Sequence, residues 1–130
     1  MIIDITNNIL TDIKMQLPEV NVITSFQSSV SKFPTILVEE IDNSHHVESK
    51  DSGGFQHSNI GISIEIYTNG SRRMSNAKDI RNRVDVILVD KYGMTRSTPT
   101  VIPNFLDDAI YRYKIIYSGV ISKNKTIYGR

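Results

Sequence analysis

Three histidines are the residues of this chain best suited to metal binding: His45, His46 and His57. A metal site needs three or four converging ligands, which carboxylates such as Glu48 or Asp51 could complete. Adjacent residues of an extended chain point to opposite sides, so His45 and His46 do not easily chelate one ion. The chain also contains no cysteine, which excludes thiolate ligands and disulfides. We therefore interpret the histidines as solvated loop residues and expect neither a metal nor a cofactor.

Catalytic patterns are also missing from the sequence. No serine lies in a Gly-x-Ser-x-Gly elbow, and no glycine-rich phosphate loop precedes a helix. The acidic pairs Glu39-Glu40 and Asp107-Asp108 are neighbours in sequence, and neighbouring side chains diverge in an extended chain. We expect no enzyme, and a hydrolase using scattered Ser, His and Asp residues is the least favoured function.

Arg72 and Arg73 are unusual because they fall in the first turn of a predicted helix, where the helix dipole is already positive. Their functional interpretation is an anionic partner, either carboxylates of a neighbouring subunit or nucleic-acid phosphate. The alternative is a solvated pair that points away from the helix end. The two interpretations are about equally favoured.

Tyr111, Tyr113 and Tyr117 alternate along a predicted strand and could stack on the bases of single-stranded nucleic acid. Tyrosine stripes of this kind more often belong to a core or an interface. With 15 basic and 14 acidic residues, the chain lacks the excess of positive charge that is typical of DNA-binding proteins. We favour core or interface.

The length of 130 residues predicts one domain, residues 1–130. No apolar stretch approaches the roughly 20 residues that cross a bilayer, so we expect no membrane contact. Apolar residues at helical spacing predict a first helix that ends at Pro18. A short strand is expected at 20–23, a longer one at 33–41, and a polar connection at 42–56.

Four alternating isoleucines predict a strand at 60–66, and Asn69-Gly70-Ser71 closes it and can cap a second helix. Gly93 lies just past the end of that helix, and the tyrosine-rich segment forms a last strand from Ala109. The second helix is expected to bury a stripe made of Met74, Ala77, Ile80, Val84, Ile87 and Leu88. The fold class is therefore α+β, a mostly antiparallel β-sheet with two α-helices packed on one face.

This arrangement resembles the tail terminator, or tail completion, proteins of long-tailed bacteriophages and related contractile particles. The resemblance covers nearly the whole chain. It is carried by the first helix ending at Pro18, the helix starting near Arg72, and the segments 33–43, 60–66 and 110–115.

The resemblance implies a hexameric ring that caps the tail tube, ends tube polymerisation and offers a surface for head attachment. Its expected partners are further copies of the chain, the tail tube protein, head–tail connector proteins, and DNA in passage through the lumen. The implied location is the head-proximal end of the virion tail, after assembly in host cytoplasm. Arg72 and Arg73 are candidates for the lumen or for a subunit contact.

The polar connection at 42–56 has a composition that would become ordered only on contact, so we expect it to dock the tube or a neighbouring subunit. Its candidate contact residues are His45, His46, Val47, Glu48, Lys50, Asp51 and Phe55. Two other functions remain open: a head–tail connector or stopper, and a small cytosolic domain that binds a ligand or nucleic acid.

Overall fold

A computed structural model describes residues 6–24, 32–47, 56–102, 109–122 and 127–128 of the chain. At 42–47, 56–58, 120–122 and 127–128 the description is of the backbone alone. The helices are α1 (Thr6–Gln16), α2 (Arg73–Asp85) and the π-helical η2 (Val86–Lys91). The strands are β1 (Asn21–Ile23), β2 (Thr35–Val47), β3 (Gln56–Thr68), β4 (Thr95–Arg96), β5 (Thr100–Ile102), β6 (Tyr111–Ser122) and β7 (Ile127–Tyr128).

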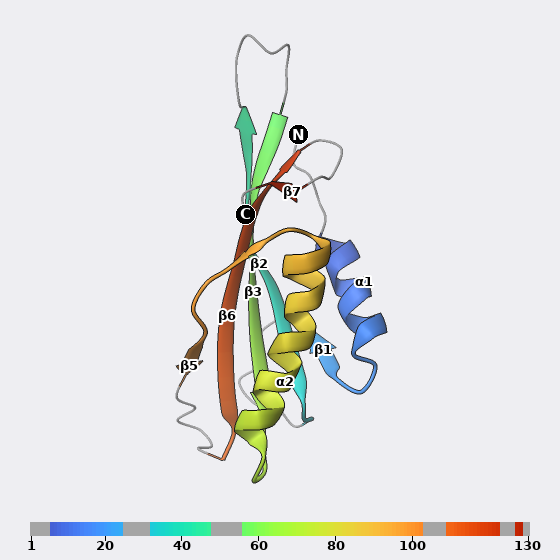
Figure 1. Cartoon of the computed structure of the whole chain (residues 1–130), viewed down its shortest axis with the longest axis vertical. Helices are drawn as coiled ribbons and strands as arrows, with labels where there is room; N and C mark the ends of the chain where they lie inside the picture. The colour runs from blue at the N-terminus through green and yellow to red at the C-terminus, as the bar shows by residue number, and fades with distance from the viewer. Residues whose placement is uncertain (1–5, 25–31, 48–55, 103–108, 123–126, 129–130) are drawn as a thin grey trace.

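The strands form one mixed sheet in the order β1-β2-β3-β6-β4, with β5 and β7 also paired to β6. β1 runs parallel to β2, and every other pairing is antiparallel. Both helices pack against the same face of the sheet (Figure 1). The predicted α+β class, with a mostly antiparallel sheet and two helices on one face, is confirmed.

The core lies between this face and the helices. Period-two alternation places Ile60, Ile62, Ile64 and Ile66 of β3 on the helix side, where each is at most 1% exposed. Ile9, Ile13 and Leu17 follow the helical spacing predicted from the sequence and are fully buried. Strand β3 is central and therefore fixes the position of both helices.

The second helix changes its winding after Asp85. In η2 the main-chain N–H of Tyr92 donates to the carbonyl of Ile87 at 3.1 Å, which is the i→i−5 spacing of a π-helix. Gly93 then adopts φ +74°, the left-handed conformation that favours glycine and that the sequence predicted there. No described helix is both long enough and apolar enough to span a membrane.

Three predictions about local structure are wrong. The polar connection expected at 42–56 is shorter, because β2 continues to Val47 and β3 begins at Gln56. Backbone pairing extends β2 beyond Ile41 and begins β3 ahead of Ile60, since a ladder needs only main-chain groups. Met74 is 54% exposed and does not belong to the buried stripe. The cap expected from Asn69-Gly70-Ser71 does not form, because Arg72 occupies the N-cap position of α2 and makes no side-chain cap hydrogen bond.

Ile64→Ala tests the central position of β3. Removing a fully buried isoleucine side chain should lower the free energy of unfolding by about 2–5 kcal/mol, because a cavity remains under the helices. Met74→Ala on the exposed side of α2 should change it by less than about 0.5 kcal/mol. Urea denaturation of the two variants measures the difference, and equal effects would contradict the assigned core.

Candidate functional site

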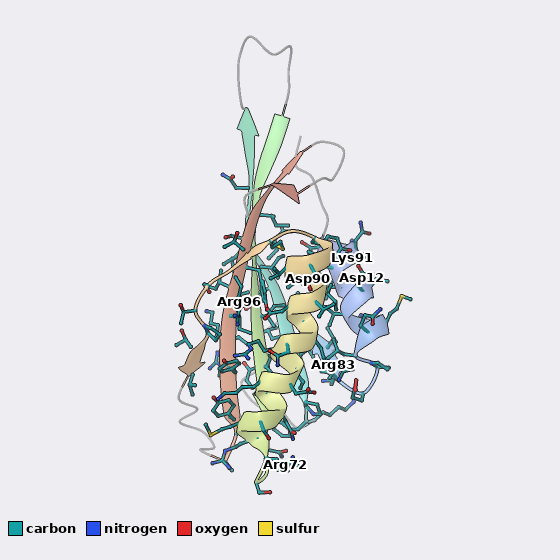
Figure 2. The ribbon with its side chains drawn as sticks, viewed as in Figure 1. Asp12, Arg72, Arg83, Asp90, Lys91 and Arg96 are labelled. Atoms are coloured by element: carbon teal, nitrogen blue, oxygen red, sulfur yellow. The ribbon has the colours of Figure 1, made fainter. Side chains whose placement is uncertain are left out.

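The two predicted arginines lie at the start of α2, at one end of the molecule (Figure 2). Arg72 is exposed, and its carbonyl accepts a hydrogen bond from the Oγ of Ser75 at 3.2 Å. Arg73 is half-buried, and its Nη1 donates to the carbonyl of Gly70 at 3.1 Å. The guanidinium of Arg73 thus helps to satisfy the turn before the helix, whereas that of Arg72 is displayed to solvent.

The described part of the predicted docking segment, residues 42–47 with Gln56, lies at the opposite end (Figure 1). There β2, β3 and β6 continue past the helices as a projecting sheet of residues 42–47, 56–59 and 120–122, which we call the arm. His45, His46 and Val47 are strand residues of the arm, and His46 is the register partner of His57. Glu48, Lys50, Asp51 and Phe55 lie outside the described residues. The arm and Arg72 are therefore two separate candidate surfaces.

The outer edge of β2 adds a feature that the sequence analysis missed. β1 pairs with β2 only from Thr35 to Leu37. In the part of the chain that the structure describes, β2 from Val38 to Val47 is paired on its β3 side alone. Such an edge presents main-chain donors and acceptors to a partner strand.

Tyr113 and Tyr117 of β6 belong to the core, one of the two settings that the sequence analysis favoured, and Tyr111 is half-buried against it. Tyr113 is 6% exposed and Tyr117 is fully buried. Each hydroxyl has a partner: Tyr117 donates to Asp85 Oδ1 at 2.6 Å, and Arg81 Nη1 donates to the Tyr113 hydroxyl at 2.9 Å. Burial of these two rings removes them from any surface on which bases could stack.

A buried ion pair lies on the sheet face opposite the helices. Arg112 Nε on β6 contacts Glu65 Oε1 on β3 at 2.5 Å, and the Glu65 side chain is 5% exposed. The Tyr67 hydroxyl donates to the same carboxylate at 3.2 Å, while the Arg112 guanidinium lies 5.5 Å from the centre of the Tyr67 ring. Burial, with the charge of Glu65 second, raises the pKa of Tyr67 to about 12. This cluster fixes the register between β3 and β6.

A groove of about 280 Å³ separates α1 from α2 and η2, and ion pairs and hydrogen bonds cross it at both ends (Figure 2). At one end Arg83 on α2 contacts Glu19 at 3.0 Å and donates to the carbonyl of Gln16 at 2.9 Å. At the other end Lys91 contacts Asp12 at 2.9 Å, and the Tyr92 hydroxyl donates to the same carboxylate. These contacts occupy both ends of the groove, and they hold α1 against α2 and η2.

A second cavity, of about 420 Å³, lies between η2 and β4. Its lining includes Asp85 and Asp90, which are five residues apart, together with Arg96. The wider π-helical turn brings residues at this spacing to one side of the helix. Arg96 Nε lies 3.5 Å from Asp85 Oδ2, so one of the two carboxylates already has a cation beside it.

Metal-binding geometry is absent from the described residues, where no three His, Cys, Asp or Glu side chains gather. That statement does not cover His45, His46 and His57, because only their backbone is described.

Arg112→Met should lower the free energy of unfolding by about 3–5 kcal/mol, because it leaves the buried Glu65 carboxylate without its cation. The double change Glu65→Leu with Arg112→Met removes both charges and should be far closer to the parent protein. Urea denaturation of the single and double variants checks this. A double variant as unstable as the single one would show that the pair itself is not the cause.

Acid sensitivity should depend partly on Asp12. Hydrogen bonds from Tyr92, and then from Lys91, lower the pKa of the Asp12 carboxyl below its ordinary value of 3.8. The folded state thus binds a proton at Asp12 less readily than the unfolded state does. The stabilisation by ionised Asp12 is therefore present above about pH 4 and is lost as pH falls through the folded pKa. Asp12→Asn should cost less than about 1 kcal/mol at pH 7, since Lys91 is 60% exposed.

Unfolding free energies of the parent protein and of Asp12→Asn, measured between pH 7 and pH 2.5, should converge at the acid end. A constant difference across that range would contradict the assigned linkage.

Comparison with known proteins adds no family to this geometry. The sequence matches no protein-family model and no curated protein. Inference about function therefore depends on the residues, the sheet edges and the arm described above.

Proposed function

We propose that this chain is a structural assembly protein of the tail-terminator type, which forms a closed ring of six copies on the end of a tail tube. The ring would end tube polymerisation and offer its other side to the head. The observation that carries the proposal is the arm. A protein that caps a tube needs an element that extends beyond its own core to reach the tube subunits.

The arm suits that role for a physical reason. Its strands continue beyond the helices, so they have main-chain pairing without the layer of helices that covers the core (Figure 1). Its sequence from Asp42 to His46 is polar, which keeps a projecting sheet soluble until a partner covers it. Docking through the arm would add backbone hydrogen bonds or side-chain contacts without disturbing the core.

The sheet edges also support assembly into a ring. One edge is formed by β1 and the longer β2, and the other by the short strands β4, β5 and β7 along β6. A contact between two unlike surfaces is heterologous, and it closes into a ring when the rotation per copy divides a full turn. Arg72 lies at the end away from the arm (Figure 2) and in this proposal would face either the lumen or a neighbouring copy.

The proposal is tested by shortening the hairpin of the arm. Val47 and Gln56 are register partners, so residues 48–55 can be replaced by Asn-Gly, which forms a two-residue hairpin turn. The shortened protein should keep its melting temperature and its mass by light scattering, but it should no longer cap purified tail tubes in electron micrographs. The parent protein should be a hexamer, or a monomer that forms terminal rings on tubes.

A variant with residues 48–55 in reversed order is the matched control, since it keeps length, charge and composition. If both variants lose capping, docking depends on specific side chains of this segment. If only the shortened variant loses it, docking depends on the length of the segment. Normal capping by the shortened protein would refute docking through residues 48–55. A parent protein that stays monomeric and ignores tubes, or that binds heads instead, would refute the terminator function.

A further inference from the structure

We propose that residues 42–47, the outer edge of β2 in the arm, bind an extended strand of the tail tube subunit by β-strand addition. The partner strand would lengthen the sheet by one strand, and its main-chain N–H and C=O groups would pair with those of β2. The inference deepens the proposed function and rests on it, because it names the contact through which the arm would hold the tube.

The outer edge of β6 is covered by the chain itself. β5 pairs with residues 112–114, β4 with 117–118 and β7 with 120–121. Between β5 and β4, the main-chain N–H of Ile116 donates to the Oγ of Ser97 at 3.1 Å. The N–H of Ser97 donates to the Ile116 carbonyl at 2.8 Å. Short segments thus satisfy this edge along most of its length.

The outer edge of β2 is different. β1 pairs with residues 35–37, and no other described strand joins that side of β2. The contrast is clearest in the arm, where β7 lies beside β6 (Figure 1) while residues 42–47 pair with β3 alone, as far as the structure describes the chain. Every second residue of such an edge points its main-chain groups away from the sheet. This stretch therefore presents a row of donors and acceptors to a further strand.

The register of β2 selects residues 42–47 as the usable part of this edge. The register with β3 shifts between Glu40 and Asp42, which marks a β-bulge. A bulge disrupts the regular ladder, so a partner strand cannot pair evenly across it. From Asp42 to Val47 the pairing with β3 has no further shift. This stretch has the length of an ordinary strand, about 5–6 residues.

The main-chain row favours an extended segment as the occupant, because a helix uses its own N–H and C=O groups internally. The sequence from Asp42 to His46 is polar, so affinity would come from backbone pairing more than from apolar burial.

A second copy of this chain is less suited to the same edge. Its β6 edge is already covered, so among the described strands it could offer only its own β2. Two β2 edges would form an isologous pair, which closes at two copies and cannot continue into a ring. The tube subunit, which the arm is proposed to reach, is therefore the inferred partner.

Proline substitution tests strand addition, because neighbouring residues of β2 point their N–H groups alternately toward β3 and away from it. A proline in place of an N–H that faces β3 should lower the melting temperature, and one in place of an outward N–H should leave it unchanged. The variants that keep the parent melting temperature should bind tubes about tenfold more weakly or worse, since proline removes a donor and obstructs the partner strand. The four single variants are Asn43→Pro, Ser44→Pro, His45→Pro and His46→Pro.

The double variant His45→Ala with His46→Ala is the matched control, since it removes two side chains and keeps every main-chain donor. It should cap tubes as the parent protein does. Normal capping by the proline variants that keep their melting temperature would overturn strand addition. Loss of capping in the double alanine variant would overturn it too, because docking would then depend on side chains.

Hydrogen exchange followed by mass spectrometry provides a direct measurement. The outward amides of residues 42–47 should exchange quickly in the free protein and about tenfold more slowly or less when rings are bound to tubes. Rings on tubes without this slowing would refute the edge contact and leave the terminator function standing. Equal slowing in concentrated protein without tubes would identify a second copy as the occupant and overturn the tube strand. A parent protein that ignores tubes would refute both proposals.

Discussion

Burial of the central strand β3 is the constraint on which the rest of the structure depends. Its isoleucines pack under both helices, and β2 and β6 pair with it along its length. Its opposite face is also buried, at Ser63, Glu65 and Tyr67. A strand covered on both faces and paired on both edges cannot shift its register by one residue without moving its isoleucines away from the helices and Glu65 beneath them. The two sheet edges and the arm are therefore fixed relative to one core.

The helices are held by two different means. Apolar side chains at helical spacing bury one face of each helix against the sheet. Polar contacts at the outer surface then set the position of α1 against α2 and η2, through Arg83 with Glu19 and through Lys91 and Tyr92 with Asp12. The π-helical turn takes part, because Lys91 is its last residue and Tyr92 follows it directly. Burial supplies most of the stabilisation, and the exposed ion pairs add specificity to the packing.

The surfaces proposed for assembly lie where the core ends. Helices cover the sheet from about Ile60 to Ile66, while the arm extends beyond them with polar residues on β2. The two edges differ in strand length and in the irregularity at Ile41. A rigid core with a projecting arm and two unlike edges is suited to positioning one copy against others, whereas a catalytic function would require groups converging in a cavity.

The sequence by itself determined the helices, the isoleucine strand, the left-handed Gly93 and the alternation that puts Tyr113 and Tyr117 on one side of a strand, because each follows from a local period or a local conformational preference. Only the tertiary structure decided that β1 runs parallel to β2, that the strands continue into the arm, and that Glu65 pairs with Arg112. These depend on register between segments far apart in the chain, and backbone ladders form without any characteristic side-chain pattern. Met74 shows the same limit of sequence analysis. Helical spacing puts it on the apolar face of α2, but only the packing shows that the sheet does not cover this face as far as Met74.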